Sequence, residues 1–381
     1  MSIRSILIIS HEFPPLGGGA GRVTASLCEE LASRGFAIEV WTQKPSGTIA
    51  HEGRSYAVRY FTTGRRSVFQ TDLLSMGVFL CKVLFASLKS VRRRFGCVMS
   101  IMAIPSGIAG GIVARRLKIP HLIWYHGADI HANRPPGAGA IHRLVLRGIW
   151  WSTTAHYFPS DSLMKMAQSY ASLKNTRIIG VAPRIVDRRD PVRHPKVELS
   201  ERLFVFLGRM EEVKNPLLLI RALSLMITEF KMPKTRIALL GDGVLLSDAR
   251  KLSLELGLGQ NCIFTGYADG PRLISFLAKA YCLVLPSRAE AFPLTVLEAA
   301  SFGVPTIGSD TVGIRDAVVN NQTGLLFPEG DTRKCAEAMS LLAGNLELRN
   351  KLGMNAQVRI EKFTIQKSAD ALERALKKIS V

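Results

Sequence analysis

Residues 281–300 read YCLVLPSRAEAFPLTVLEAA, and this stretch decides how the second half of the chain is interpreted. An apolar run at 281–285 precedes a polar segment, and apolar residues from Leu294 onward recur at helical spacing. The pattern predicts a strand, a turn and a helix, with Glu290 in the turn and Glu298 in the second helical turn. On spacing alone, a binding role for the two carboxylates is no better supported than a simpler explanation, in which Glu290 is a loop acid and Glu298 a solvated helical glutamate. Acidic residues are common near helix starts.

The start of this helix is expected to attract anions. Pro293 suits the first helical position, where a missing N–H has no cost. The amides of Leu294 and Thr295 then have no acceptor within the helix and point out of its start. Such a helix start favours bound anions such as phosphate.

The same alternation of strand and helix recurs along the whole chain. Further apolar segments predict strands at 3–10, 37–42, 98–102, 121–125, 155–159, 177–181, 203–207, 236–240, 262–265 and 304–308. Repeated alternation gives a parallel sheet with helices on both faces. The two series of segments therefore predict an α/β protein with two doubly wound, Rossmann-like domains that face one cleft.

The length of 381 residues also suggests two domains. We place the first at residues 1–183 and the second at 184–364, because residues 182–196 are dense in Pro and Arg, as in a connection between domains. The segment from 365 onward has apolar residues on one helical face and is predicted as a helix.

Two features of the first half stand where ligands bind in open α/β sheets. Gly17-Gly18-Gly19 follows the first strand and precedes a helix predicted at 23–32. The glycines fit neither the G-x-G-x-x-G nor the G-x-x-x-x-G-K-[ST] pattern, although bare glycine amides still allow a ligand to approach closely. His126 follows the strand at 121–125, beyond its carboxyl end. A lone histidine is also often a structural hydrogen-bonding group.

Composition indicates a cytoplasmic protein. No apolar run reaches the roughly 18 residues that span a bilayer, and the run at 6–9 is too short for the apolar part of a signal peptide. The six cysteines form no C-x-x-C pair, which argues against a disulfide framework and against a zinc site. We therefore expect reduced thiols and no bound metal.

The net charge of +20 is concentrated in the first half, where residues 1–183 hold 22 Lys and Arg against 8 Asp and Glu. A basic surface suits nucleic acid, an anionic membrane or an anionic substrate, or it serves solubility alone. The helical stretch at 72–91 ends in Arg92-Arg93-Arg94. It is either a core helix with a basic end or a helix that lies in the membrane interface.

Four charged residues follow two strands of the second half and are expected at the same edge of its sheet: Arg209, Lys214, Glu290 and Glu298. A diphosphate requires positive charge, which a guanidinium and an ammonium supply. A carboxylate accepts hydrogen bonds from ribose or sugar hydroxyls. Together these residues predict a site for a nucleotide-sugar.

These motifs carry a family resemblance. The chain resembles a retaining glycosyltransferase of the GT-B fold, in the large family 4 (glycosyl transferases group 1). The resemblance covers nearly the whole chain and rests on a set of short motifs: Gly17-Gly18-Gly19, His126-Gly127, Gly208-Arg209 with Lys214, Gly241-Asp242-Gly243, and Glu290 and Glu298 with seven residues between them. The spacing of Glu290 and Glu298 together with the upstream Arg209 and Lys214 is a specific indicator of the family. Each of these motifs alone is a weak indicator.

The resemblance implies roles for individual residues. Glu290 would bind hydroxyls of the donor sugar and Glu298 the ribose, while Arg209 and Lys214 would hold the diphosphate and stabilise it as it leaves. The remaining implied contacts are His126 at the sugar, Gly18 and Gly19 near phosphate and acceptor, Asp242 at the donor, Gly266 and Tyr267 beside the base, and the Leu294 and Thr295 amides at the phosphate. Family members generally work without a bound metal or cofactor, and the final helix would cross back to the N-terminal domain.

The sequence thus predicts transfer of a sugar from a nucleotide-sugar donor to a glycan or lipid-linked acceptor, in the assembly of cell-surface polysaccharide or lipopolysaccharide. The predicted location is the cytoplasm, with peripheral contact to the inner face of the plasma membrane. A nucleotide-sugar epimerase on the same fold is one alternative. A basic nucleic-acid-binding protein is the other, and it is disfavoured because only 7% of residues are aromatic, too few for interleaved stacking platforms.

Overall fold

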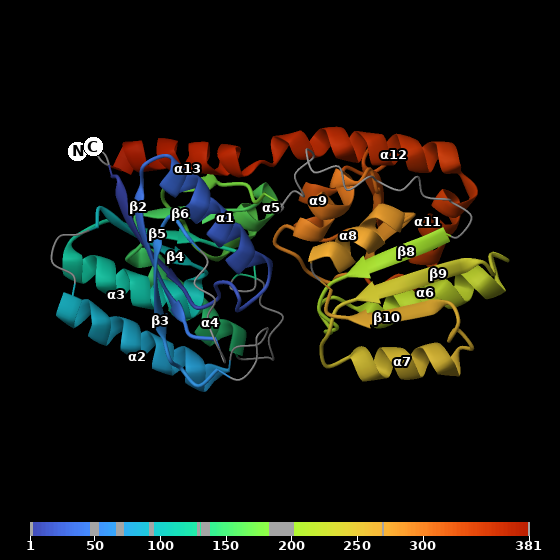
Figure 1. Ribbon diagram of the computed structural model, residues 1–381, viewed down its shortest axis with the longest axis horizontal. Helices are drawn as coiled ribbons and strands as arrows, with labels where there is room; N and C mark the ends of the chain where they lie inside the picture. The colour runs from blue at the N-terminus through green and yellow to red at the C-terminus, as the bar shows by residue number, and fades with distance from the viewer. Residues whose placement is uncertain are drawn as a thin grey trace. The chain divides into compact units, whose positions relative to one another are not determined.

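The chain forms two compact units, each built on its own sheet (Figure 1). The computed structural model describes residues 3–45, 53–65, 72–90, 95–127, 130, 138–182, 202–268 and 270–379. Met1–Arg184 with Thr364–Val381 make up the N-terminal unit, and Ile185–Phe363 make up the C-terminal unit. The predicted connection lies, from Pro183 onward, outside the described residues, as do Arg92-Arg93-Arg94.

The sheet of the N-terminal unit has seven parallel strands in the order β3-β2-β1-β4-β5-β6-β7. Their bounds are β1 (Ser5–Ser10), β2 (Ala37–Gln43), β3 (Ala57–Phe61), β4 (Cys97–Ile101), β5 (His121–Trp124), β6 (Ala155–Phe158) and β7 (Thr176–Ile178). The central strands are continuous apolar runs because helices cover both faces, and the side chains from Ile6 to Ile9 are all fully buried. The order reverses between β1 and β4, and such a switch point is where open α/β sheets bind ligands.

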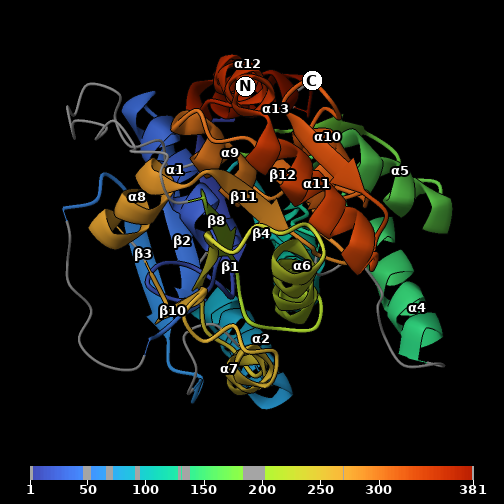
Figure 2. The ribbon, with the colours of Figure 1, turned by 90° about the vertical axis from the view of Figure 1, so that its right-hand side faces the viewer.

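Helices cover the two faces of this sheet. They are α1 (Gly19–Ser33), α2 (Leu73–Ser90), α3 (Ile108–Leu117), α4 (Ala138–Trp151), α5 (Asp161–Tyr170) and α13 (Ile365–Ile379), with a short helical turn η1 (Ala103–Gly107) before α3. α1 packs on α13, while α2 and α3 pack on one another at the opposite face. Figure 2 shows the same order, with β1 and β4 between α13 and α2.

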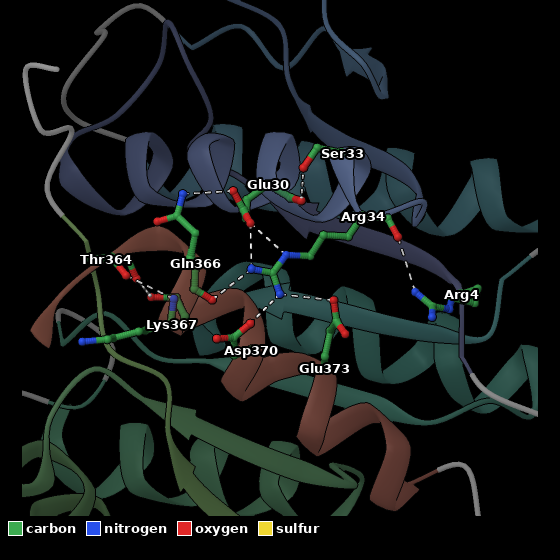
Figure 3. Close-up of polar contacts among 10 residues, drawn as sticks. Arg4, Glu30, Ser33, Arg34, Thr364, Gln366, Lys367, Asp370 and Glu373 are labelled. Carbon is green, nitrogen blue, oxygen red and sulfur yellow. Dashed lines mark hydrogen bonds and ion pairs between the residues drawn. The ribbon is translucent and has the colours of Figure 1, made fainter. Parts of the chain in front are cut away.

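The last helix of the chain, α13, is held on α1 by one arginine of the N-terminal unit (Figure 3). Arg34, just after α1, contacts Asp370 at 2.6 Å and Glu373 at 3.3 Å on α13, and Glu30 at 2.7 Å on its own helix. These three carboxylates raise the pKa of Arg34, Asp370 most. The Ser368 hydroxyl adds a hydrogen bond to the Gly180 carbonyl (2.7 Å). The chain thus returns to its first unit at its end.

The sheet of the C-terminal unit has six parallel strands in the order β10-β9-β8-β11-β12-β13. The strands are β8 (Arg202–Leu207), β9 (Thr235–Leu240), β10 (Cys262–Gly266), β11 (Cys282–Leu285), β12 (Thr306–Ser309) and β13 (Gly324–Phe327). The helices are α6 (Pro216–Thr228), α7 (Leu246–Glu255), α8 (Gly270–Lys279), α9 (Leu294–Ser301), α10 (Ile314–Ala317), α11 (Thr332–Gly344) and α12 (Leu346–Arg359), followed by the turn η2 (Ile360–Lys362). α6 and α11 pack together over a core that contains Phe204 and Phe206.

The prediction of two doubly wound α/β units is confirmed, and so are all the predicted strands, within a few residues at their ends. Two strands were not predicted, β3 and β13, and each lies at an edge of its sheet. The first helix was predicted to begin at Val23. It begins at Gly19, because the glycines extend the helix into the loop rather than ending it.

Candidate active site

The candidate site lies where the strand order of the C-terminal sheet reverses, between β8 and β11. These two strands pair in parallel, with Cys282 opposite Phe204 and Leu283 opposite Val205. Their carboxyl ends therefore open at the same edge, and the loops that follow them lie side by side. Ligands of doubly wound folds bind at this kind of edge.

An ion pair joins the two loops. The Lys214 Nζ atom donates to Glu290 Oε1 at 2.6 Å, and the Ser287 hydroxyl donates to the same oxygen at 2.9 Å. The Lys214 side chain is 20% exposed and that of Glu290 is 12% exposed, so one edge of the pair remains open to a ligand. The expectation that these residues meet at one sheet edge agrees with this geometry.

The loop that carries Glu290 is held from several directions. The Arg288 amide donates to the Val213 carbonyl (2.8 Å), beside Lys214, and the Ser309 hydroxyl at the end of β12 donates to the Ser287 carbonyl. Gly313, with φ +81°, lies against the same loop: a Cβ atom placed on it would be 2.7 Å from the carbonyl carbon of Ala291. Only a glycine fits there, so the backbone beyond β12 fixes the position of the Glu290 loop.

Arg209 belongs to a tightly packed turn beside this pair. Its Nη1 atom lies 3.1 Å from Glu211 Oε1, and its side chain is 45% exposed. The Met210 amide donates to the Asp242 carbonyl (2.8 Å), and Gly241 is so close to the Gly208 carbonyl that a side chain there would collide with it. The Gly-Asp-Gly segment therefore supports the turn that presents Arg209. The Asp242 carboxylate accepts the Gly243 amide at 2.7 Å.

Gly266 and Tyr267 are joined to the same region through the backbone. The Gly241 amide donates to the Gly266 carbonyl at 2.9 Å, as part of an isolated bridge between the ends of β9 and β10. Gly266 has φ +67° and open space around its Cα, and Tyr267 is 48% exposed. This part of the site can thus take a flat group against an aromatic ring.

Helix α9 begins one residue later than predicted. Pro293 has φ −75° and ψ 109°, which is an extended conformation, so it is the N-cap and Leu294 is the first helical residue. The first amides of the helix, at Leu294 and Thr295, still precede any acceptor within it. Glu298 lies in the second turn, as expected, and is partly buried.

Three predicted residues belong to the N-terminal unit. Gly18 is the N-cap of α1 and Gly19 is its first residue. His126 follows β5, half-buried, with its ring 4.7 Å from that of Trp124. Burial lowers the pKa of His126 to about 3, so the imidazole is neutral at pH 7, and its Nε2 atom has no hydrogen-bond partner among the described residues.

Three residues that touch the predicted site were not assigned to it from the sequence: Glu211, Ser287 and Gly313. Their roles depend on how the loops fold over one another. Only Ser287 could have been found from the sequence, since it lies three residues before Glu290 in the same loop. In the portions of the chain that the structure covers, no group of His, Cys, Asp and Glu side chains is placed to hold a metal ion.

The arrangement has a clear chemical character. Two cations and a helix start supply positive potential for an anion, and two carboxylates with partly exposed edges accept hydrogen bonds from hydroxyl groups. In the structure each cation is paired with a carboxylate, Lys214 with Glu290 and Arg209 with Glu211. A diphosphate ligand would compete with these carboxylates for the two cations.

Comparisons with known proteins identify the family of the chain. Residues 17–188 match the family model described as Glycosyltransferase Family 4, and residues 188–359 match that described as Glycosyl transferases group 1. Over 376 residues, the chain is 26% identical to an N-acetyl-alpha-D-glucosaminyl L-malate synthase of Bacillus anthracis, which covers 94% of this chain and 93% of the relative. Over 184 residues it is 32% identical to a sulfoquinovosyl transferase of Arabidopsis thaliana, which covers 48% of this chain and 34% of the relative.

Solved structures show the same fold. A sucrose-phosphate synthase from Thermosynechococcus elongatus superposes with a TM-score of 0.79 at 20% identity, over 99% of both chains. HepE of Anabaena in complex with UDP superposes with a TM-score of 0.78 at 16% identity, over 98% of this chain and 100% of the other. The two family models together span residues 17–359, and the chain belongs to the group 1 and family 4 glycosyltransferases of GT-B fold, enzymes that transfer a sugar from a nucleotide-sugar donor.

Proposed function

We propose that this glycosyltransferase binds a uridine diphosphate sugar at the C-terminal unit and transfers its sugar with retention of the anomeric configuration. The observation that carries the proposal is the Lys214–Glu290 ion pair at the switch point between β8 and β11. A diphosphate that draws Lys214 to itself would free a lone pair of Glu290 for a sugar hydroxyl. The choice of uridine is supported by HepE, a structural neighbour solved with UDP and with UDP-glucose.

Each predicted residue then has one role. Arg209 and Lys214 hold the diphosphate together with the Leu294 and Thr295 amides, and Glu298 accepts the ribose hydroxyls. Glu290 orients the sugar. Gly266 and Tyr267 border the base, and Asp242 keeps the Arg209 turn in place at the donor.

The proposed reaction is a front-face substitution. The bond between the anomeric carbon and the diphosphate oxygen breaks, the acceptor oxygen bonds to the same face of that carbon, and the acceptor proton passes to the departing phosphate oxygen. Negative charge develops on the diphosphate, so Arg209, Lys214 and the start of α9 stabilise the transition state more than the ground state. No carboxylate nucleophile is required, and no metal ion takes part in the proposed step.

The N-terminal unit is proposed to hold the acceptor, a glycan or a lipid-linked glycan in polysaccharide or lipopolysaccharide assembly at the inner face of the plasma membrane. Its basic surface suits an anionic acceptor. His126, neutral at pH 7, would donate or accept a hydrogen bond at the sugar, and Gly18 and Gly19 would allow close approach at the start of α1.

A thermal-shift screen of UDP, GDP and ADP sugars tests donor binding. At a given ligand concentration, a more tightly bound ligand raises the melting temperature more, so a UDP-sugar should stabilise the wild type and have less effect on Glu290→Gln. Stabilisation by none of the donors would overturn the proposal. Sugar product formed without any acceptor would instead identify an epimerase.

A further inference from the structure

Helix α2 carries apolar side chains on its outer face as well as on its inner face, whereas an ordinary surface helix is polar on its outer face. Its inner face is buried through Phe79 and Val83. The exposed large apolar side chains are Leu73 (87% exposed), Leu74 (78%), Phe85 (65%) and Leu88 (54%). Leu73, Leu74 and Phe85 line a shallow hollow of about 500 Å³ that also includes Cys81. We call Leu73, Leu74, Cys81, Phe85 and Leu88 the α2 ridge.

The neighbouring helices continue this surface. α2 packs on α3 (Figure 1). A second hollow, of about 430 Å³, is lined by residues of α3 and α4. Trp151 at its rim is 81% exposed, and the Arg115 guanidinium lies 5.1 Å from the centre of that ring. An exposed tryptophan beside an arginine is typical of the interface between water and a bilayer, where one side of the ring is apolar and the other is wet.

The charges of this region are almost all positive. Residues 73–160 contain eleven Lys and Arg and a single acidic residue, Asp129. Helices α2, α3 and α4 have no carboxylate at all. The exposed basic side chains described on them are Lys82, Arg115, Arg116, Arg143 and Arg147. A second copy of this chain docked through the same face would bring like charges together, whereas an anionic surface would be attracted.

We propose that the α2 ridge docks the protein on an anionic lipid bilayer. Leu73, Leu74, Phe85 and Leu88 enter the boundary between headgroups and acyl chains, and the basic residues of α3 and α4 lie at the phosphates. The helix lies in the interface and does not cross it, since none of the helices in the described ranges is long and apolar enough to span a membrane. This inference goes beyond the proposed sugar transfer and does not depend on it.

Cys81 is a natural reporter for this contact. All six cysteines lie in described residues, and Cys81 alone is exposed, in the middle of the ridge. The full chain is treated with a water-soluble maleimide in buffer, with phosphatidylcholine vesicles, and with vesicles containing phosphatidylglycerol. Labelling of Cys81 should slow roughly fivefold or more with the anionic vesicles alone, and high salt should partly restore it.

Three results would overturn the proposal. One is an unchanged labelling rate at an excess of anionic vesicles. Another is protection without vesicles that increases with protein concentration, which would mean that a second copy covers the ridge. The third is equal protection by duplex DNA at the same phosphate concentration, which would identify a nucleic-acid surface.

A matched pair of variants locates the contact. Leu74→Ser with Phe85→Ser should lower the partition onto anionic vesicles roughly tenfold or more, because two inserted apolar side chains are lost. The control Leu254→Ser with Val358→Ser replaces side chains of similar exposure (71% and 67%) on the C-terminal unit and should change it less than about twofold. Equal effects of the two pairs would refute the assignment. Neither measurement uses donor or acceptor, so failure of the proposed sugar transfer would leave both results intact.

Discussion

Replacing Lys214 with methionine removes one cation from the candidate site and keeps the length of the side chain. In the structure the Nζ atom lies 2.6 Å from Glu290 Oε1, and the two side chains are 20% and 12% exposed. After the substitution the carboxylate keeps the Ser287 hydroxyl at 2.9 Å but loses its charged partner. The change is therefore expected to affect both the stability of the protein and, through the role proposed for Lys214, the departure of the diphosphate.

The two effects differ in size. Removing one partner of a fully buried pair costs about 3–5 kcal/mol, and of an exposed pair about 0–1 kcal/mol, so this mostly buried pair should cost about 1–3 kcal/mol. A domain of ordinary stability, about 5–15 kcal/mol, remains folded after such a loss. Loss of a group that stabilises the departing anion should lower kcat by about 10² to 10³. Unfolding alone cannot account for a decrease of that size.

The assay is turnover with saturating donor at 25 °C, combined with urea unfolding of the same sample. The control is Arg333→Met, which breaks the Arg333–Glu229 pair (2.9 Å) at an exposed position of the same unit, where the side chains are 57% and 45% exposed. That variant should keep its turnover and lose less than about 1 kcal/mol. If Lys214→Met retains more than about a third of wild-type turnover, the role assigned to Lys214 is refuted.

Three further predictions concern the supports of the site and of the N-terminal unit. Gly313→Ala should lower turnover and stability more than Gly330→Ala. Both positions have positive φ (+81° and +78°), but only at Gly313 would the new side chain meet the backbone of the Glu290 loop. Equal losses of activity and of stability to urea in the two variants would contradict this prediction. Arg34→Ala should lower the free energy of unfolding by about 1–3 kcal/mol and speed amide exchange in α13, with α11 as the internal control. Unchanged exchange in α13 would contradict the view that Arg34 holds this helix on α1. Burial lowers the pKa values of four histidines below 6.5, so between about pH 4 and 6.5 the unfolded chain binds more protons than the folded one. The N-terminal unit should therefore lose stability as the pH falls from about 6.5 towards 4. A constant urea midpoint between pH 7.5 and 5 would contradict this prediction. The histidines are His11 and His156 (pKa about 4) and His121 and His126 (pKa about 3).

The central strands were all predictable from the sequence, whereas two of the four edge strands, β3 and β13, were not. Strands such as β1 and β11 are continuous apolar runs because helices cover both faces of each sheet. β3 carries Arg59 in its middle, and β13 has three apolar residues after Gly324; both lie at a sheet edge where one side of the strand has no neighbour. Their apolar runs are therefore shorter than the run at 6–9 that marks the central strand β1.

The meeting of Lys214 and Glu290 was also predictable, because parallel strands place their carboxyl ends at one edge. The partners that hold this pair were not. The bond from Ser309 to Ser287 and the contact of Gly313 with Ala291 depend on how three loops fold over one another. No local pattern in a single sequence records such contacts. The N-cap role of Pro293 has the same origin, since the preceding loop fixes its extended backbone.

The return of α13 to α1 has a consequence for how the protein is made. The N-terminal unit takes residues from both ends of the chain, with Ile185–Phe363 inserted between them. A ribosome that adds about 5–20 residues per second needs roughly 10–40 seconds to synthesise that insert. During this interval the surface of α1 that contacts α13 stays uncovered and Arg34 lacks Asp370 and Glu373. The first unit to emerge is therefore the last to be completed, and the nascent chain carries an open helix face that a chaperone could shield.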